Sequence, residues 1–450
     1  MPTWFTQMRA RPVAATLLFV GMGFSTAAPA EDLLEVYQIS LDNDATYQAA
    51  KFQYSASTEA MPQARAGLLP DVAFSAEHIQ THQDIVSSDN IYYANADARF
   101  PTDDLTLSLT QPLFRYDAWI GYKQSKVAVA QAKTQLSVAL QQLIVDVADS
   151  YFAVLAAQDQ LEYARVEKTA VAKQLEFAKG RTRTGLARVT DLYDAQARFS
   201  ASESREIKAE NALDDAYQAL RVHTKKYITD LSPVQDQMPL TTPDPAEPEQ
   251  WIKAALEENL TLLEKQQSLE LATQEVKRQK AGHMPTLDFL ASRNRRDTEG
   301  SLLGGGSDVQ TTDFLVRFKL PIYEGGSVNS KMRQAANERE QSREEMEAAR
   351  REVVRATRAA YLGVLSGIKN VQALKQAIIA QEKTIEVKTA GLRAGMNTML
   401  EVLDAQRDLY FGRTDFSRAR YDYLLSTLRL KQSTGSLSVA DLEEINRLMK

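Results

Sequence analysis

The stretch TGLARVTDLYDAQ at residues 184–196 decides the fold, because AGMNTMLEVLDAQ at residues 394–406 repeats its pattern about 210 positions later. The second residue of each copy is a glycine, an apolar residue follows it, and DAQ closes the copy. The same offset pairs Tyr151 with Tyr361. Repetition with matched spacing predicts one structural unit that is used twice.

A long segment without proline precedes each copy of the pattern, at residues 117–178 and 328–390. Its composition favours helix, and roughly 60 residues at 1.5 Å per residue predict a helix of about 90 Å. After each pattern the chain is expected to reverse into a shorter helix, over residues 189–227 and 399–431. In the first long helix, apolar residues recur at spacings of three and four, which predicts a coiled-coil seam of Leu136, Leu140, Leu143, Val147, Tyr151 and Val154.

Each short return helix needs a companion to match the length of the long one. Residues 33–66, interrupted by Pro62, and residues 250–282 have helical spacing and a suitable length. We therefore expect two shorter helices, stacked end to end, beside each long helix. Proline-rich residues 232–249 predict an extended linker between the two units, residues 31–231 and 250–450.

Two segments before each long helix alternate between apolar and polar residues, which predicts strands. The second and fourth segments, LTLSLTQP at 105–112 and FLVRFKLP at 314–321, end on Pro112 and Pro321. About 10 residues span a membrane as a tilted strand, and Arg317 and Lys319 would then face a water-filled lumen. The alternating apolar residues are Val72, Phe74, Ala76, Leu105, Leu107, Leu109, Leu287, Phe289, Ala291, Phe314, Val316, Phe318 and Leu320.

Aromatic residues lie near the ends of the predicted strands. Such residues form girdles at the two interfaces of membrane β-proteins, although isolated surface aromatics are an equally good interpretation. The candidates are Tyr92, Tyr93 and Phe100 at one end, and Phe114, Tyr116, Trp119 and Tyr323 at the other.

The first 30 residues have the features of a secretory signal peptide: Arg9 and Arg11, the apolar run 13–24, and an Ala-Pro-Ala site ending at Ala30. Its removal leaves 51 basic and 59 acidic residues, a net charge of −8, which argues against a nucleic-acid partner. The chain has no cysteine, so disulfides and a lipoprotein anchor are excluded. We expect no transmembrane helix after the signal, because no run of about 18 apolar residues follows it.

Four predicted strands are too few to close a membrane barrel, because about eight is the smallest number known. The chain is therefore expected to oligomerise. A dimer with eight strands and a trimer with twelve both satisfy this requirement.

The order and duplication of these motifs resemble the outer membrane efflux protein family, over nearly the whole mature chain. The matching motifs are AGLLPDV (66–72), AGHMPTLDF (281–289), TQPLF (110–114), KLPIYEGG (319–326), DLYDAQ (191–196) and EVLDAQ (401–406). The resemblance implies a mainly α-helical homotrimer with a 12-stranded outer membrane β-barrel, continued across the periplasm by a coiled-coil α-helical barrel with two repeats per chain.

This family implies an export duct in the outer membrane of a Gram-negative bacterium, which a periplasmic adaptor and an inner membrane ABC or proton-driven transporter supply. YQISLDNDATYQAA (37–50) and AMPQARAGLLP (60–70) are most similar to members that secrete polypeptides by the type I route. Drug or metal efflux is the alternative cargo. A periplasmic coiled-coil scaffold is the alternative outside the family, and the alternating strands argue against it.

Acidic pairs follow both glycine turns, at a spacing of three that places each pair on one helix face. By resemblance, Glu401 and Asp404 match the positions that surround the closed periplasmic aperture, where mutual repulsion would raise some pKa values. Helix capping by Thr398 and Glu401 is the alternative, and solvation is the alternative for Asp191 and Asp194.

The glycine turns themselves are expected to be helix C-caps. By resemblance, Gly185, Leu186, Gly395 and Met396 form tips that contact the adaptor. The family's closing latch, an aromatic residue and an arginine, aligns with Leu392 and Asn397, so ion pairs from Arg181, Arg183, Arg188 or Arg393 would have to replace it.

We find no phosphate loop, nucleophile elbow or ordered nucleophile and base, so the sequence does not predict an enzyme. No cofactor is expected. His78 and His82 fall in a predicted strand and loop, where a spacing of four does not bring side chains together, so no metal site is expected either.

Overall fold

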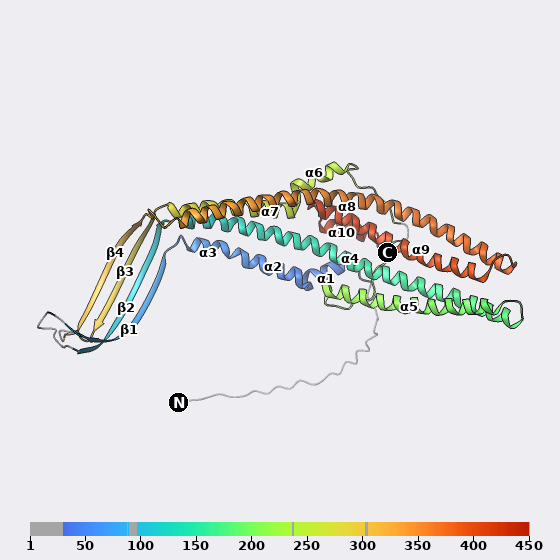
Figure 1. Cartoon of the computed structure of the whole chain (residues 1–450), viewed down its shortest axis with the longest axis horizontal. Coiled ribbons are helices and arrows are strands. Elements are labelled where there is room, and N and C mark those ends of the chain that lie inside the picture. The colour runs from blue at the N-terminus through green and yellow to red at the C-terminus, as the bar shows by residue number, and fades with distance from the viewer. Residues whose placement is uncertain (1–29, 88, 90–96, 236–237, 302–304, 450) are drawn as a thin grey trace, which may run out of the picture.

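The protein is elongated in the computed structural model, with a sheet at one end and two helical hairpins at the other (Figure 1). The structure describes residues 30–87, 89, 97–235, 238–301 and 305–449. The predicted signal peptide up to residue 29 and the two girdle candidates Tyr92 and Tyr93 lie outside the described residues.

The four predicted strands form one antiparallel sheet in the order β1-β2-β3-β4. They contain 13 to 18 residues each, more than the ten expected, because polar residues such as His78 and Asp103 continue the ladder past the apolar part. Leu320 lies just outside the last strand. The strands are β1 Asp71–Asp84, β2 Asp97–Phe114, β3 Thr286–Thr298 and β4 Ser307–Lys319.

The sheet has one apolar and one polar face. Directly paired residues of neighbouring strands point to the same face. Leu109 pairs with Ala291, which pairs with Phe314, and the ring of Phe314 stacks 6.5 Å from that of Phe289. On the other face, the polar residues include Asp104, Thr106, Ser292, Asn294, Arg296, Asp313, Arg317 and Lys319.

The two long helices lie where the sequence predicts them, and each reverses into a helix of 36 residues. In the predicted seam, Leu143, Val147, Tyr151 and Val154 are buried, whereas Leu136 and Leu140 are half-buried. The helices are α4 Tyr116–Arg183, α5 Val189–Thr224, α8 Ser327–Arg393 and α9 Met399–Thr434.

Shorter helices stack end to end along the long ones, as expected (Figure 1). The first companion breaks at Asp44 and Glu59 rather than at Pro62. Pro62 is the third residue of its helix, where a missing N–H removes no intrahelical bond. The companions are α1 Leu33–Asn43, α2 Ala45–Thr58 and α3 Ala60–Ala66 for α4, and α6 Pro248–Glu258, α7 Leu260–Lys280 and the 3-10 turn η2 Ala281–His283 for α8.

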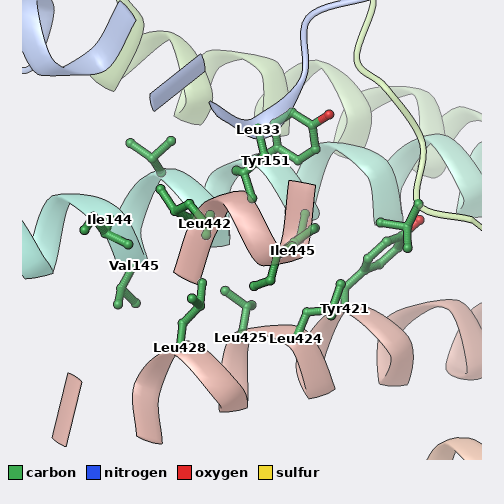
Figure 2. Packing of buried hydrophobic residues seen from close by; sticks show 14 of the residues in the cluster. Leu33, Ile144, Val145, Tyr151, Tyr421, Leu424, Leu425, Leu428, Leu442 and Ile445 are labelled. Atoms are coloured by element: carbon green, nitrogen blue, oxygen red, sulfur yellow. The ribbon is translucent and has the colours of Figure 1, made fainter. Parts of the chain in front are cut away.

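The main core lies halfway along the helices, where α10 (Val439–Asn446), an element that sequence analysis missed, inserts between α4 and α9 (Figure 2). Its Leu442 is completely buried. The two matched tyrosines both tie the linker to this core: the Tyr151 hydroxyl donates to the carbonyl of Ser232 at 2.7 Å, and the Tyr361 hydroxyl donates to that of Ala246. The linker is therefore packed rather than free.

One helix has the length and composition of a membrane span, although the sequence predicts no transmembrane helix after the signal. Among the described residues, α4 contains a window that is long and apolar enough to cross a membrane. More than half of that window is buried inside the chain, and α4 contributes many apolar residues to the core of Figure 2. Its apolar residues are therefore accounted for by packing against α1, α9 and α10.

Candidate functional site

The two glycine turns lie at the same end of the molecule, farthest from the sheet (Figure 1). Gly185 and Gly395 have φ values of 72° and 77°, in the left-handed region that other residues resist. At the first turn the Leu186 amide donates to the carbonyl of Arg181 at 2.8 Å, and the Gly185 amide donates to that of Thr182 at 3.1 Å. The second turn repeats both bonds. Both turns are thus Schellman caps, which satisfy the last carbonyls of α4 and α8.

The residue after each glycine is apolar and exposed. Leu186 is 70% exposed and Met396 is 79% exposed. In a Schellman cap this residue frequently packs back on the preceding turn, where it would be covered. The caps explain the glycines, but they do not explain two exposed apolar side chains at corresponding tips.

Glu401 caps its own helix. Its backbone amide donates to the Thr398 hydroxyl oxygen, and its carboxylate accepts from the Thr398 amide, which completes the capping box that the alternative interpretation expected. The Asn397 side chain also donates to the carboxylate, at 2.6 Å. The Asn397 and Thr398 donors hold the pKa of Glu401 below its usual range within one chain. The rise that the resemblance implies depends on repulsion between carboxylates of several copies.

Asp404 joins the two return helices. Its carboxylate accepts from Arg198 of α5 at 2.6 Å and lies 3.4 Å from Arg407 of its own helix. None of the four arginines expected to make such pairs takes part. The sequence did not point to Arg198 as the partner of Asp404. Arg198 follows Asp194 by four residues, and this spacing suggests an ion pair within α5 rather than a bond to another helix.

Asp191 is half-buried and Asp194 is exposed, and neither has an ion-pair partner in the part of the chain that the structure describes. The four carboxylates do not gather into a cluster that could hold a metal ion among the described residues of a single chain. A cation site at this end would therefore need carboxylates from several copies.

An apolar cluster beneath the turns, here called the tip cluster, holds the four helices together. Leu392 is 7% exposed and belongs to this cluster, so this side chain is not available as a surface latch. Asn397 is occupied by Glu401. The tip cluster consists of Val171, Leu175, Ala178, Ala195, Leu392, Met399, Val402 and Leu403.

Residues 36–224 and 251–436 match the family model described as "Outer membrane efflux protein". Over 432 residues the chain is 33% identical to "Outer membrane protein TolC" of Vibrio cholerae, covering 95% of each chain. It is 29% identical over 442 residues to "Proteases secretion protein PrtF" of Dickeya chrysanthemi, covering 97% of this chain and 95% of the relative.

A solved structure has the same fold. The CmeC outer membrane channel of Campylobacter jejuni superposes with a TM-score of 0.80 at 14% identity, covering 94% of this chain and 90% of that one.

Proposed function

The chain belongs to the outer membrane efflux protein family, and from this membership we propose that three copies assemble into one duct that exports polypeptides by the type I route. The protein lies in the outer membrane of a Gram-negative bacterium and extends into the periplasm. The observation that carries the proposal is a sheet with one apolar and one polar face, attached to helices of 67 and 68 residues.

Assembly follows from the incompleteness of this sheet. About eight strands are the fewest that close a membrane barrel, and one chain supplies four. Three copies supply twelve strands, whose apolar faces meet lipid and whose polar faces line the lumen. At 1.5 Å per residue, the long helices extend about 100 Å from the barrel. The proposed units are residues 31–231 and 250–450, joined by linker 232–249.

The polypeptide cargo is supported by the likeness to the protease secretion protein along almost its full length. Drug or metal efflux remains the alternative cargo. The likeness to the Campylobacter channel concerns the fold alone and does not distinguish between these cargoes. A duct has no reaction that could drive transport. We therefore propose that an ABC transporter of the inner membrane supplies the energy and that a periplasmic adaptor joins it to this protein.

The duct is tested on the purified full-length protein. We expect a trimer in mild detergent that dissociates on heating, and single channels of one defined conductance in planar lipid bilayers. A protein recovered from the periplasm as a monomer, or one that never conducts, would contradict the duct and favour the coiled-coil scaffold.

We further propose that Glu401 and Asp404 of three copies surround the periplasmic aperture and bind cations. The low pKa of Glu401 supports this role, because the carboxylate stays ionised near neutral pH. Asp191 and Asp194 add carboxylates on the neighbouring return helix. The pair of Asp404 with Arg198 connects α9 to α5, so the same residue also restrains the helices that would separate on opening.

The double variant Glu401→Ala with Asp404→Ala is expected to raise single-channel conductance and to weaken block by divalent cations about tenfold. That change corresponds to about 1.4 kcal/mol of lost attraction between cation and carboxylate. Asp408→Ala is the matched control, because this exposed carboxylate lies one turn further along α9. Unchanged conductance and unchanged divalent block in the double variant would exclude the aperture role.

A further inference from the structure

A cavity of about 770 Å³, here called the neck cavity, lies where the sheet meets the helices. The ends of β3 and β4 and the first turns of α4 and α8 contribute to its wall, together with the ends of α3 and α7. Arg317 and Lys319 enter it from the polar face of the sheet. The neck cavity is therefore on the side of the sheet that faces away from lipid.

Cationic side chains outnumber anionic ones in this wall. The cations are Arg115, Arg278, Arg317, Lys319 and Lys331, and the anions are Asp117, Asp288 and Glu324.

Much of the negative charge is already neutralised. Asp288 is 6% exposed and accepts two bonds from Arg115, at 2.7 and 2.9 Å. Arg278 is held in the same manner by Glu275, outside the cavity wall, at 2.8 and 2.9 Å. The guanidinium groups of Arg115 and Arg278 therefore already have carboxylate partners.

Three cations have no such partner. Arg317, Lys319 and Lys331 make no ion pair within the described part of the chain, and all three are exposed. Asp117 and Glu324 are the other two carboxylates of the wall. Arg317 is directly opposite Asp288 in the β3–β4 ladder, but the Asp288 carboxylate already accepts two bonds from Arg115. Asp313 is on the same face of β4 as Arg317 but four residues away, about 13 Å at the rise of a strand. The neck cavity thus presents an excess of unpaired positive charge.

From this excess we propose that the neck cavity binds anionic groups, carboxylates or phosphates, of solutes that move along the lumen. The inference rests on the proposed duct, because that assembly turns the polar face inward and repeats the cavity three times around one axis. Arg317 supplies a planar fork for two oxygens, and Lys319 and Lys331 supply compact charges. The duct would then carry opposite charge at the two ends of its helical part, with anion binding at the neck and cation binding at the aperture.

The test uses the full-length trimer in planar bilayers, with inorganic tripolyphosphate and a hexaglutamate peptide as separate probes. Both probes are expected to block the wild-type channel. Arg317→Gln with Lys319→Gln should weaken the block about tenfold and shift the reversal potential in a KCl gradient toward cation selectivity. Block by tripolyphosphate alone identifies a free phosphate as the ligand, whereas block by both probes extends the ligand to acidic segments of a polypeptide.

Lys319→Arg is the matched control, because it keeps the charge and should keep the block. Lys331→Gln lies on α8 rather than in the sheet, and it provides an independent variant if the double variant does not assemble. Equal block in wild-type, Lys331→Gln and double-variant channels would overturn the site while the duct stands. A wild-type protein that never conducts would overturn the duct itself.

Discussion

Replacing Phe314 by arginine is expected to prevent stable insertion of the protein into the outer membrane. Phe314 is on the apolar face of the sheet, pairs with Ala291 and stacks on Phe289. An arginine that faces lipid near the middle of a membrane barrel costs about 2–4 kcal/mol, and a trimer carries the substitution three times. The amount of heat-dissociable trimer in the outer membrane fraction measures the effect.

Asp313→Arg is the control for this substitution. It introduces the same side chain at the preceding residue, which is on the polar face. We expect Asp313→Arg to insert normally, because its side chain meets water in the lumen. Equal amounts of trimer from both variants would show that the apolar face does not contact lipid, and the scaffold interpretation would then be preferred.

Replacing the exposed apolar residues of both tips by aspartate is expected to abolish binding of the periplasmic adaptor. Leu186 and Met396 are more exposed than a helix cap requires. An apolar residue at the centre of an interface contributes about 2 kcal/mol or more, so Leu186→Asp with Met396→Asp should weaken binding by roughly 30-fold or more. Site-specific cross-linking to the adaptor in intact cells measures this loss.

Leu186→Met and Met396→Leu are the matched controls, because both keep an apolar side chain on an unchanged Schellman cap. They should cross-link as the wild type does. The aspartate variants should still form trimers, because the tip cluster beneath them is intact. Adaptor cross-linking at the wild-type level in the double aspartate variant would refute this role of the tips.

Local patterns predicted the strands, the long helices and the two turns well, since each depends on neighbours in the chain. Alternation with period two defined the apolar face that ends at Phe314, and the absence of proline defined the long helices. The requirement for a left-handed residue explains Gly185 and Gly395. The strand ends were predicted less well, because polar residues of a lumen-facing ladder do not differ in type from those of a loop.

The identity of the ion-pair partners could not be predicted in this way. The long helices bring together residues that are far apart in sequence, so the partner of Asp404 proved to be Arg198, 206 residues earlier. α10 was missed for a related reason, because a helix of 8 residues owes its stability to the core it enters rather than to its own composition.

Residue types and their spacing thus established the two-sided strands, the long helices and the glycine turns, because steric and hydrophobic preferences act within a few residues. The arrangement of side chains around the tips and the neck was decided by tertiary packing. Leu392 became a core residue there, and Lys319 and Lys331, from different elements, came to line one cavity. Charges interact through space, so the partners of a charged side chain depend on which elements the fold places side by side.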